Sequence, residues 1–116
     1  MLRPKHRIPL DYSLCTMTVT VYRREGLTRE VLEGVHFEFT DELQTENGRS
    51  TENRSFLLVI PGICGIAPGD KVALGVGPAD ITWDGLTPAA VPTLGVVKTV
   101  KPRFFRGVPC HVEARG

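Results

Sequence analysis

Apolar and polar positions alternate along two stretches in the first third of the chain. Residues 15–23, CTMTVTVYR, alternate valine with threonine, and residues 30–40, EVLEGVHFEFT, place a valine and two phenylalanines on one side. A period of two is typical of a β-strand with one buried face. We therefore predict two strands, the first with a half-solvated threonine face and the second with a β-bulge at Gly34.

The same alternation recurs in residues 94–115, which predict a β-hairpin. Its first arm is VVKTV, and its second arm, VPCHVEAR, alternates apolar positions with His111 and two charged residues on the opposite face. Pro102 and Gly107 bracket the connection, because a missing N–H group and a permissive φ both suit a turn. An isolated hairpin is marginally stable in water, so we expect the upstream strands to form its partner sheet.

The middle of the chain predicts shorter elements. Residues 56–61, FLLVIP, form a continuous apolar run typical of a central strand, and residues 71–74 and 81–83 predict two short strands. Residues 86–93 have room for one helical turn. Together with twelve glycines and nine prolines, these stretches predict an all-β fold over residues 1–116, a small antiparallel β-barrel or sandwich of six to seven short strands in a single domain.

Two segments fall outside this pattern. Residues 1–10 are basic and contain two prolines, so we expect an extended N-terminal arm. Residues 41–55, DELQTENGRSTENRS, contain one apolar residue and predict a long projecting polar loop that is mobile in the isolated subunit. The alternative is a protruding β-ribbon whose tip is Asn47-Gly48.

Charge is distributed unevenly, although the formal net charge is only +1. Residues 1–24 carry a net charge of +4, residues 25–52 carry −6, and residues 85–116 carry +4. Such asymmetry favours contacts between unlike surfaces. The longest apolar runs are too short to span a bilayer, and the N-terminus lacks the apolar stretch of a signal peptide, so we expect no membrane association and synthesis in a cytoplasm.

Motifs for catalysis, metal binding or cofactor binding are missing from the sequence. It contains no phosphate-binding glycine loop, no GxSxG and no Cys/His metal spacing. A Cys64 nucleophile served by His36 or His111 is the arrangement that the residue types allow, but nothing local activates Cys64. We therefore predict a protein that is not an enzyme, has no cofactor, and keeps its three cysteines reduced.

The tetrapeptide Arg103-Phe104-Phe105-Arg106 is the most distinctive surface candidate. Aromatic residues between arginines can stack on single-stranded nucleic acid, as in an OB-like β-barrel nucleic-acid-binding module. They equally suit docking to another protein, since Phe and Arg are favoured in interfaces. We favour protein docking, because the acidic middle of the chain would repel a long polyanion.

The order of the segments resembles a known family. TVTVYRR, EGVHFEF, a long polar segment, an apolar strand ending in IP, PGDKVALG, ITWDG and a closing VVKTV…GVPCHVEAR hairpin follow one another over residues 15–115. This order resembles the minor-capsid or head-closure proteins at the head–tail junction of long-tailed bacteriophages. The resemblance implies a β-barrel subunit, assembled in the host bacterial cytoplasm, that forms a homo-oligomeric ring in the virion.

The resemblance also implies partners and a channel segment. Such a ring sits on the phage portal and adaptor, retains packaged DNA without sequence specificity, and receives the tail proteins. A long loop from each subunit can extend into the channel, and residues 41–55 match it. The channel candidates in this segment are Asp41, Glu42, Gln44, Glu46, Asn47, Gly48, Arg49 and Glu52.

A head-to-tail ring joins two different patches of each subunit. We predict that one patch is basic and lies on the N-terminal arm or on the terminal hairpin, with Phe104 or Phe105 as its apolar anchor. The other is acidic and lies around Glu30, Glu33 and Glu38, where alternation places Glu38 on the solvent face. The interface candidates are Arg3, Lys5, Arg7, Glu38, Lys101, Arg103, Phe104, Phe105 and Arg106.

Overall fold

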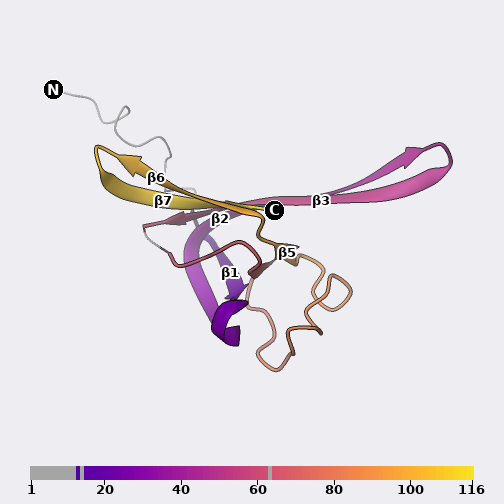
Figure 1. Ribbon diagram of the computed structural model, residues 1–116, viewed down its shortest axis with the longest axis horizontal. Helices are drawn as coiled ribbons and strands as arrows, with labels where there is room; N and C mark the ends of the chain where they lie inside the picture. The colour runs from indigo at the N-terminus through magenta and orange to yellow at the C-terminus, as the bar shows by residue number, and fades with distance from the viewer. Residues whose placement is uncertain (1–12, 14, 63) are drawn as a thin grey trace.

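The computed structural model describes residues 13, 15–62 and 64–116, which fold as one curled antiparallel sheet (Figure 1). Its strands follow the spatial order β5-β4-β1-β2-β3-β7-β6 and close about half of a barrel. A short 3-10 turn, Glu25–Leu27, links the first two strands. The strands are β1 (Met17–Tyr22), β2 (Arg29–Glu46), β3 (Arg49–Pro61), β4 (Lys71–Leu74), β5 (Gly95–Val96), β6 (Thr99–Phe105) and β7 (Val108–Arg115). The predicted all-β class is therefore confirmed.

The main core lies on the inner face of this sheet and follows the alternation of the sequence. The side chains of Val19 and Val21 on β1 and of Val35 and Phe37 on β2 are buried there, and Phe39 packs against them. The apolar run of β3 lies between β2 and β7, as predicted for a central strand. Burial of these apolar side chains is the main term that stabilises the sheet.

The bulge predicted at Gly34 is confirmed. Met17 pairs with Val35 and Thr18 pairs with Glu33, so the register skips Gly34, whose φ is +72°. A side chain would strain this left-handed backbone, which glycine adopts without penalty. The bulge marks the point at which β2 leaves β1 and continues alongside β3.

The second face of β1 is half-solvated, as predicted, only near its start, where Thr16 is exposed and Thr18 is half-buried. Further along, Thr20 and Tyr22 are buried: Thr20 is hydrogen-bonded to Gly75 and Gly77, and Tyr22 packs in a second cluster formed with residues from 81–94. Thr20 Oγ1 donates to the carbonyl of Gly75 at 2.7 Å and accepts from the Gly77 N–H at 2.8 Å. The buried hydroxyl is therefore satisfied within the fold.

The predicted strand at residues 81–83 is wrong, because these residues form part of a turn. Trp83 packs against the second cluster, and the Lys71 ammonium lies 4.4 Å from the centroid of its indole ring. The helical turn expected in residues 86–93 occurs once, where the Val91 N–H donates to the Thr87 carbonyl at 2.9 Å. Ile81 and Trp83 are therefore held by packing in the cluster of Tyr22, and not by the strand pairing that was predicted for them.

Residues 41–55 form a β-ribbon and not an unstructured loop. β2 and β3 stay paired from His36↔Val59 to Glu46↔Arg49, and Asn47-Gly48 closes the end. Both turn residues have positive φ, +53° and +76°, as a two-residue hairpin turn requires. Of the two interpretations of this segment, the protruding ribbon is the one that the structure shows (Figure 1).

The terminal hairpin has its turn at Arg106-Gly107, so the prediction that Pro102 brackets the connection is wrong. Pro102 lies within β6, opposite Val112. β6 is the last strand of the sheet, and an edge strand tolerates a residue without an N–H group. The hairpin itself is confirmed for Thr99–Phe105 and Val108–Arg115, but the start of its predicted first arm is wrong, because Val96 lies in β5 and pairs with β4. The hairpin projects from the end of the molecule opposite the β2–β3 ribbon (Figure 1).

Candidate interaction site

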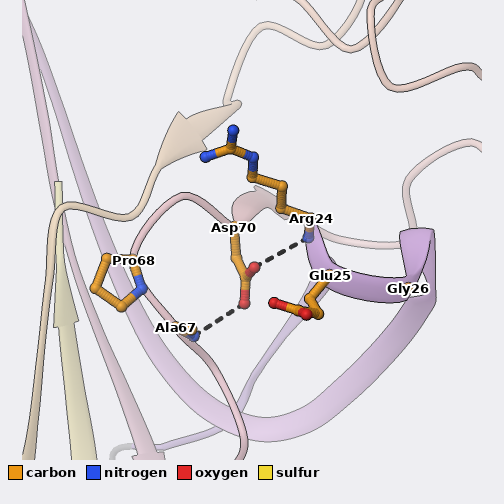
Figure 2. Close-up of a pocket in the computed structure, with 6 residues that line it drawn as sticks. All are labelled: Arg24, Glu25, Gly26, Ala67, Pro68 and Asp70. Atoms are coloured by element: carbon orange, nitrogen blue, oxygen red, sulfur yellow. Dashed lines mark hydrogen bonds between the residues drawn. The ribbon is translucent and has the colours of Figure 1, made fainter.

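A hollow of about 450 Å³ lies between the turn after β1 and the turn before β4 (Figure 2). Asp70 is buried at its edge, and both of its carboxylate oxygens are engaged. Oδ1 accepts from the Arg24 N–H at 3.0 Å, and Oδ2 accepts from the Ala67 N–H at 2.9 Å. Asp70 therefore joins two turns, a role that suits a short carboxylate side chain.

The residues considered for catalysis lie in different surroundings. Cys64 Sγ is 4.0 Å from Arg23 Nη2. His36 Nε2 lies 2.8 Å from a carboxylate oxygen of Glu38, and His111 Nε2 lies 2.9 Å from one of Glu113. Within residues 13, 15–62 and 64–116, no three His, Cys, Asp or Glu side chains are grouped so as to hold a metal ion.

Arg23 also forms an ion pair at the body end of β2. Its Nη2 lies 2.7 Å from Glu30 Oε1. Partial burial works against the charged guanidinium, but the hydrogen bond and the charge of Glu30 outweigh it, so the pKa of Arg23 is raised above its ordinary value. Glu30 and Glu38 each have a partner within the chain. Two of the three acids of the predicted interface edge are therefore already engaged.

A groove of about 380 Å³ lies where β3, β7 and β6 meet; we call it the hairpin groove. Leu57, Val59 and Phe104 make its apolar part, and Phe104 is 57% exposed. The register between β6 and β7 shifts between Arg103 and Phe104, so a bulge lies directly beside the groove. The polar lining residues are Arg103, His111, Glu113 and Arg115.

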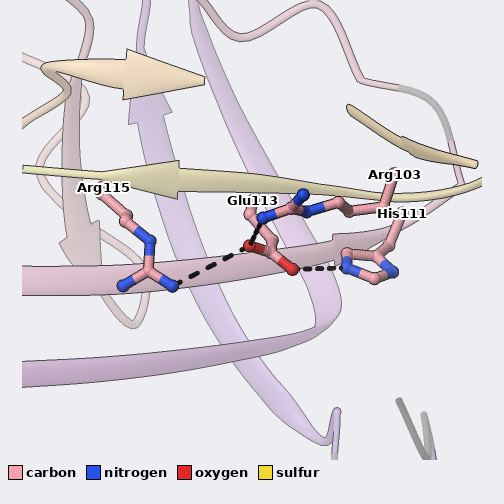
Figure 3. A network of polar contacts seen from close by, with 4 residues as sticks. All are labelled: Arg103, His111, Glu113 and Arg115. Carbon is pink, nitrogen blue, oxygen red and sulfur yellow. Dashed lines mark hydrogen bonds and ion pairs between the residues drawn. The ribbon is translucent and has the colours of Figure 1, made fainter. Parts of the chain in front are cut away.

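Figure 3 shows the Glu113 carboxylate at the centre of these polar side chains. Oε2 lies 2.9 Å from His111 Nε2, and Oε1 lies 3.1 Å from Arg103 Nη2 and 3.9 Å from Arg115 Nη2. Burial disfavours the charged carboxylate, but hydrogen bonds from His111 and Arg103 and the nearby positive charges outweigh it. The pKa of Glu113 is therefore lowered from its ordinary value.

This network was not predicted from the sequence, although one signal for it exists. His111, Glu113 and Arg115 are spaced by two, so alternation places them on the face opposite the core, as expected. Their contact with Arg103 depends on the register set by the Arg106-Gly107 turn. The burial of His111, which is 2% exposed, was not expected on that face.

The channel candidates are brought together in the β2–β3 ribbon. Residues 40–55, which we call the acidic ribbon, contain four acidic and two basic residues. Asp41, Glu42 and Glu46 are exposed, and within the described residues their side chains make no hydrogen bond or ion pair. Leu43, between them, is 70% exposed.

At the base, the Arg54 guanidinium lies 5.0 Å from the Phe39 ring centroid and donates to the carbonyls of Pro92 and Leu94.

The interface candidates are only partly brought together. Residues 99–111, which we call the basic hairpin, contain three Lys and Arg residues and no Asp or Glu. Lys101, Phe104 and Arg106 are exposed there, and Arg103 pairs with Glu113. Phe105 lies in β6, but its side chain is outside the description. Arg3, Lys5 and Arg7 also lie outside the described residues.

Comparison of the sequence with models of protein families found no match, and comparisons with curated proteins and with solved structures found none either. Among the described residues, no helix has the length and apolar character needed to cross a bilayer. Function is therefore inferred from the residues and their arrangement. The two oppositely charged projections and the hairpin groove carry exposed charged and apolar side chains.

Proposed function

We propose that the protein is a structural subunit of the head–tail junction of a long-tailed bacteriophage. Copies of the chain form a ring that closes the filled head and offers a surface to the tail. The observation that carries this proposal is a β-body from which an acidic ribbon and a basic hairpin project at opposite ends (Figure 1). Unlike surfaces on one subunit suit a heterologous interface, which forms a ring when the rotation between neighbouring subunits closes.

The resemblance in segment order supports the proposal, because every quoted segment except ITWDG contributes to a strand of the one sheet. TVTVY lies in β1, EGVHFEF in β2, the apolar run in β3 and the closing segment in β6 and β7. The polar segment that the resemblance assigns to the channel is a ribbon with more acids than bases. Acidic groups near DNA would repel its phosphates, so a passing duplex would not adhere.

The proposed partners are other copies of the chain, the portal and adaptor, the tail proteins and the packaged DNA. The proposed location is the virion, with assembly in the host cytoplasm. No enzymatic step, metal or cofactor enters this function. The thiol of Cys64 has no role in it, and the Glu113 network serves to fix the shape of the basic hairpin.

Interrupting the gene in a phage genome that carries it tests this proposal. We expect electron microscopy to show separate tails and heads that lose their DNA, and the wild-type chain supplied in trans should restore infectious particles. Cys64→Ser is the matched control and should restore them equally well. Normal particles without the chain would contradict the structural role. A folded Cys64→Ser chain that fails to restore them would favour thiol chemistry instead.

Single-stranded nucleic-acid binding is the second candidate, and exposed Phe104 between Arg103 and Arg106 favours it. Pairing of Arg103 with Glu113 reduces the positive charge available to phosphates. Fluorescence anisotropy with a labelled single-stranded oligonucleotide separates the two candidates. Binding that persists near physiological salt and is lost in Phe104→Ala would favour the nucleic-acid function.

A further inference from the structure

We propose that the acidic ribbon of one copy of the chain lies in the hairpin groove of the next copy. Copies then associate head to tail through two surfaces that each subunit carries at opposite ends. This inference rests on the proposed ring, but it assigns the ribbon to the neighbouring subunit and not to the channel. It also replaces the edge around Glu30, Glu33 and Glu38 as the acidic side of the contact.

The ribbon provides an apolar side chain surrounded by acids without partners. Leu43 is 70% exposed, which leaves a large apolar group in water on a segment that is otherwise polar. Asp41, Glu42 and Glu46 are exposed beside it, and none forms an ion pair within the described part of the chain. Glu30 and Glu38, in contrast, already have partners at 2.7 and 2.8 Å. The ribbon acids are therefore available to another molecule, whereas Glu30 and Glu38 are already engaged.

The hairpin groove provides the complementary surface. Its apolar part includes Leu57 and the exposed ring of Phe104, which can cover an apolar side chain such as Leu43. Arg103 and Arg115 share the single carboxylate of Glu113, so the groove retains an excess of positive charge. Lys101 and Arg106 are exposed on the same hairpin. Matching an apolar centre with opposite charges around it fixes orientation and register.

Charge also favours the ribbon over the N-terminal residues 1–12 as the occupant of the groove. The N-terminal residues 1–12 contain three Lys and Arg residues and one Asp, so they carry the same sign as the groove. Backbone pairing at the hairpin is an alternative mode of contact, but Pro102 on β6 and Pro109 on β7 each lack an N–H group. Proline on exposed strands discourages strand addition, which leaves a side-chain contact in the groove.

Light scattering coupled to size-exclusion chromatography at low ionic strength tests this contact, because charges between copies are then least screened. In the ribbon variant, Glu42→Lys/Glu46→Lys, both projections are basic. In the hairpin variant, Lys101→Glu/Arg106→Glu, both are acidic. We expect the wild-type chain to self-associate. For each variant alone, the dissociation constant for self-association should rise at least roughly tenfold. An equimolar mixture should recover association, with the two variants alternating.

Glu25→Lys/Glu33→Lys is the matched control, because it makes the same charge change at exposed positions of the body. It should associate like the wild-type chain, and all variants should keep the wild-type thermal unfolding. Leu43→Ala, which removes the apolar centre without changing charge, should also weaken association. If either charge variant unfolds early, Leu43→Ala and the control still decide the question.

Three results would overturn the ribbon–groove contact: a wild-type chain that stays monomeric at low salt, a control as weak as the ribbon variant, or a mixture that does not recover. None of these contradicts the proposed function, because a ring can form on the portal complex through other surfaces. A mixture that recovers but stops at two chains would support the contact and contradict the ring. The two proposals can therefore fail separately.

Discussion

The two halves of the β2–β3 ladder share one backbone geometry and differ in almost everything else. Near the body, Phe37 and Leu58 are paired and buried, and Leu58 has no exposed surface. Beyond Thr40↔Ser55 the same ladder continues, but Leu43 is 70% exposed. Backbone hydrogen bonds exchange for bonds to water and contribute modestly, whereas apolar burial contributes most. The body half therefore determines stability, and the ribbon half can be altered for binding.

Truncating one leucine in each half is the strongest test of this comparison. Leu58→Ala removes a side chain from the centre of the core, and we expect the free energy of unfolding to fall by about 2–5 kcal/mol. Leu43→Ala, on the ribbon, should change it by no more than about 0.5 kcal/mol. Urea unfolding measures both values. Similar losses for the two variants would show that the ribbon contributes to the core.

The boundary between the halves lies at Phe56, and Gly95→Ala tests how tightly it is packed. A Cβ at Gly95 would lie 2.4 Å from Phe56 Cδ2, so the ring or the β5 backbone must shift. We expect a loss of about 1–3 kcal/mol in unfolding free energy, as for other overpacked sites. Gly65→Ala is the control, because a Cβ there would meet no atom within 4 Å. Equal stability of the two variants would indicate a loosely packed boundary.

Acid should weaken the other projection through Glu113, at the root of the basic hairpin. The pKa of Glu113 is lower in the folded chain than in the unfolded chain, where it is about 4.3. Its contribution to stability is therefore complete above that pH and is lost as the pH falls through the folded pKa. Arg103 on β6 and His111 and Arg115 on β7 are the charged or titratable groups in this network.

Glu113→Gln, which cannot ionise, isolates this effect. Its unfolding free energy should fall less steeply than that of the wild-type chain as the pH is lowered below about 4.3. Chemical denaturation at a series of acidic pH values measures the two slopes. Parallel slopes would mean that Glu113 has the same pKa in the folded and unfolded chains.

The smallest expected effect is a difference in the rate of trypsin cleavage between two arginines of the ribbon. Arg49 follows the exposed turn, whereas Arg54 contacts Phe39 and donates to the Pro92 and Leu94 carbonyls. Because local opening costs least near a loop tip, trypsin should cut after Arg49 before it cuts after Arg54. Mass spectrometry of early digests identifies the site, and Arg49→Gln should delay the first cut. A first cut after Arg54 would contradict the anchored base.

The sequence was sufficient to predict the strands that have one buried face. Alternation identified β1, the buried half of β2 and the bulge at Gly34, because burial imposes a period of two. It could not decide between loop and ribbon for residues 41–55, since side chains exposed on both faces need no period. The burial of Thr20 and Tyr22 was missed for a related reason: Thr20 is hydrogen-bonded to Gly75 and Gly77, and Tyr22 packs against residues from 81–94, and a local pattern contains no information about distant segments.

The candidate site was predicted in part. The basic residues around Phe104 were identified from composition, and the ribbon was identified as a projection. The groove and the Glu113 network depend on the β6–β7 register, which the Arg106-Gly107 turn sets. The sequence placed the connection between Pro102 and Gly107, because proline is common in turns and its tolerance at an edge depends on strand order. The acidic partner was placed on the body because alternation puts Glu38 on the solvent face of its strand, and alternation alone does not show that Glu38 contacts His36.

The continuity of β2 has a mechanical consequence. The strand runs from Arg29 to Glu46, pairing first with β1 and then with β3. Past Gly34 it contains neither glycine nor proline, so the sequence offers no further interruption between the bulge and the ribbon tip. We expect a force on the ribbon tip to be transmitted along β2 to Phe37 and Phe39 in the core. A molecule that binds the ribbon can therefore exert a force on the core of the subunit through a single strand.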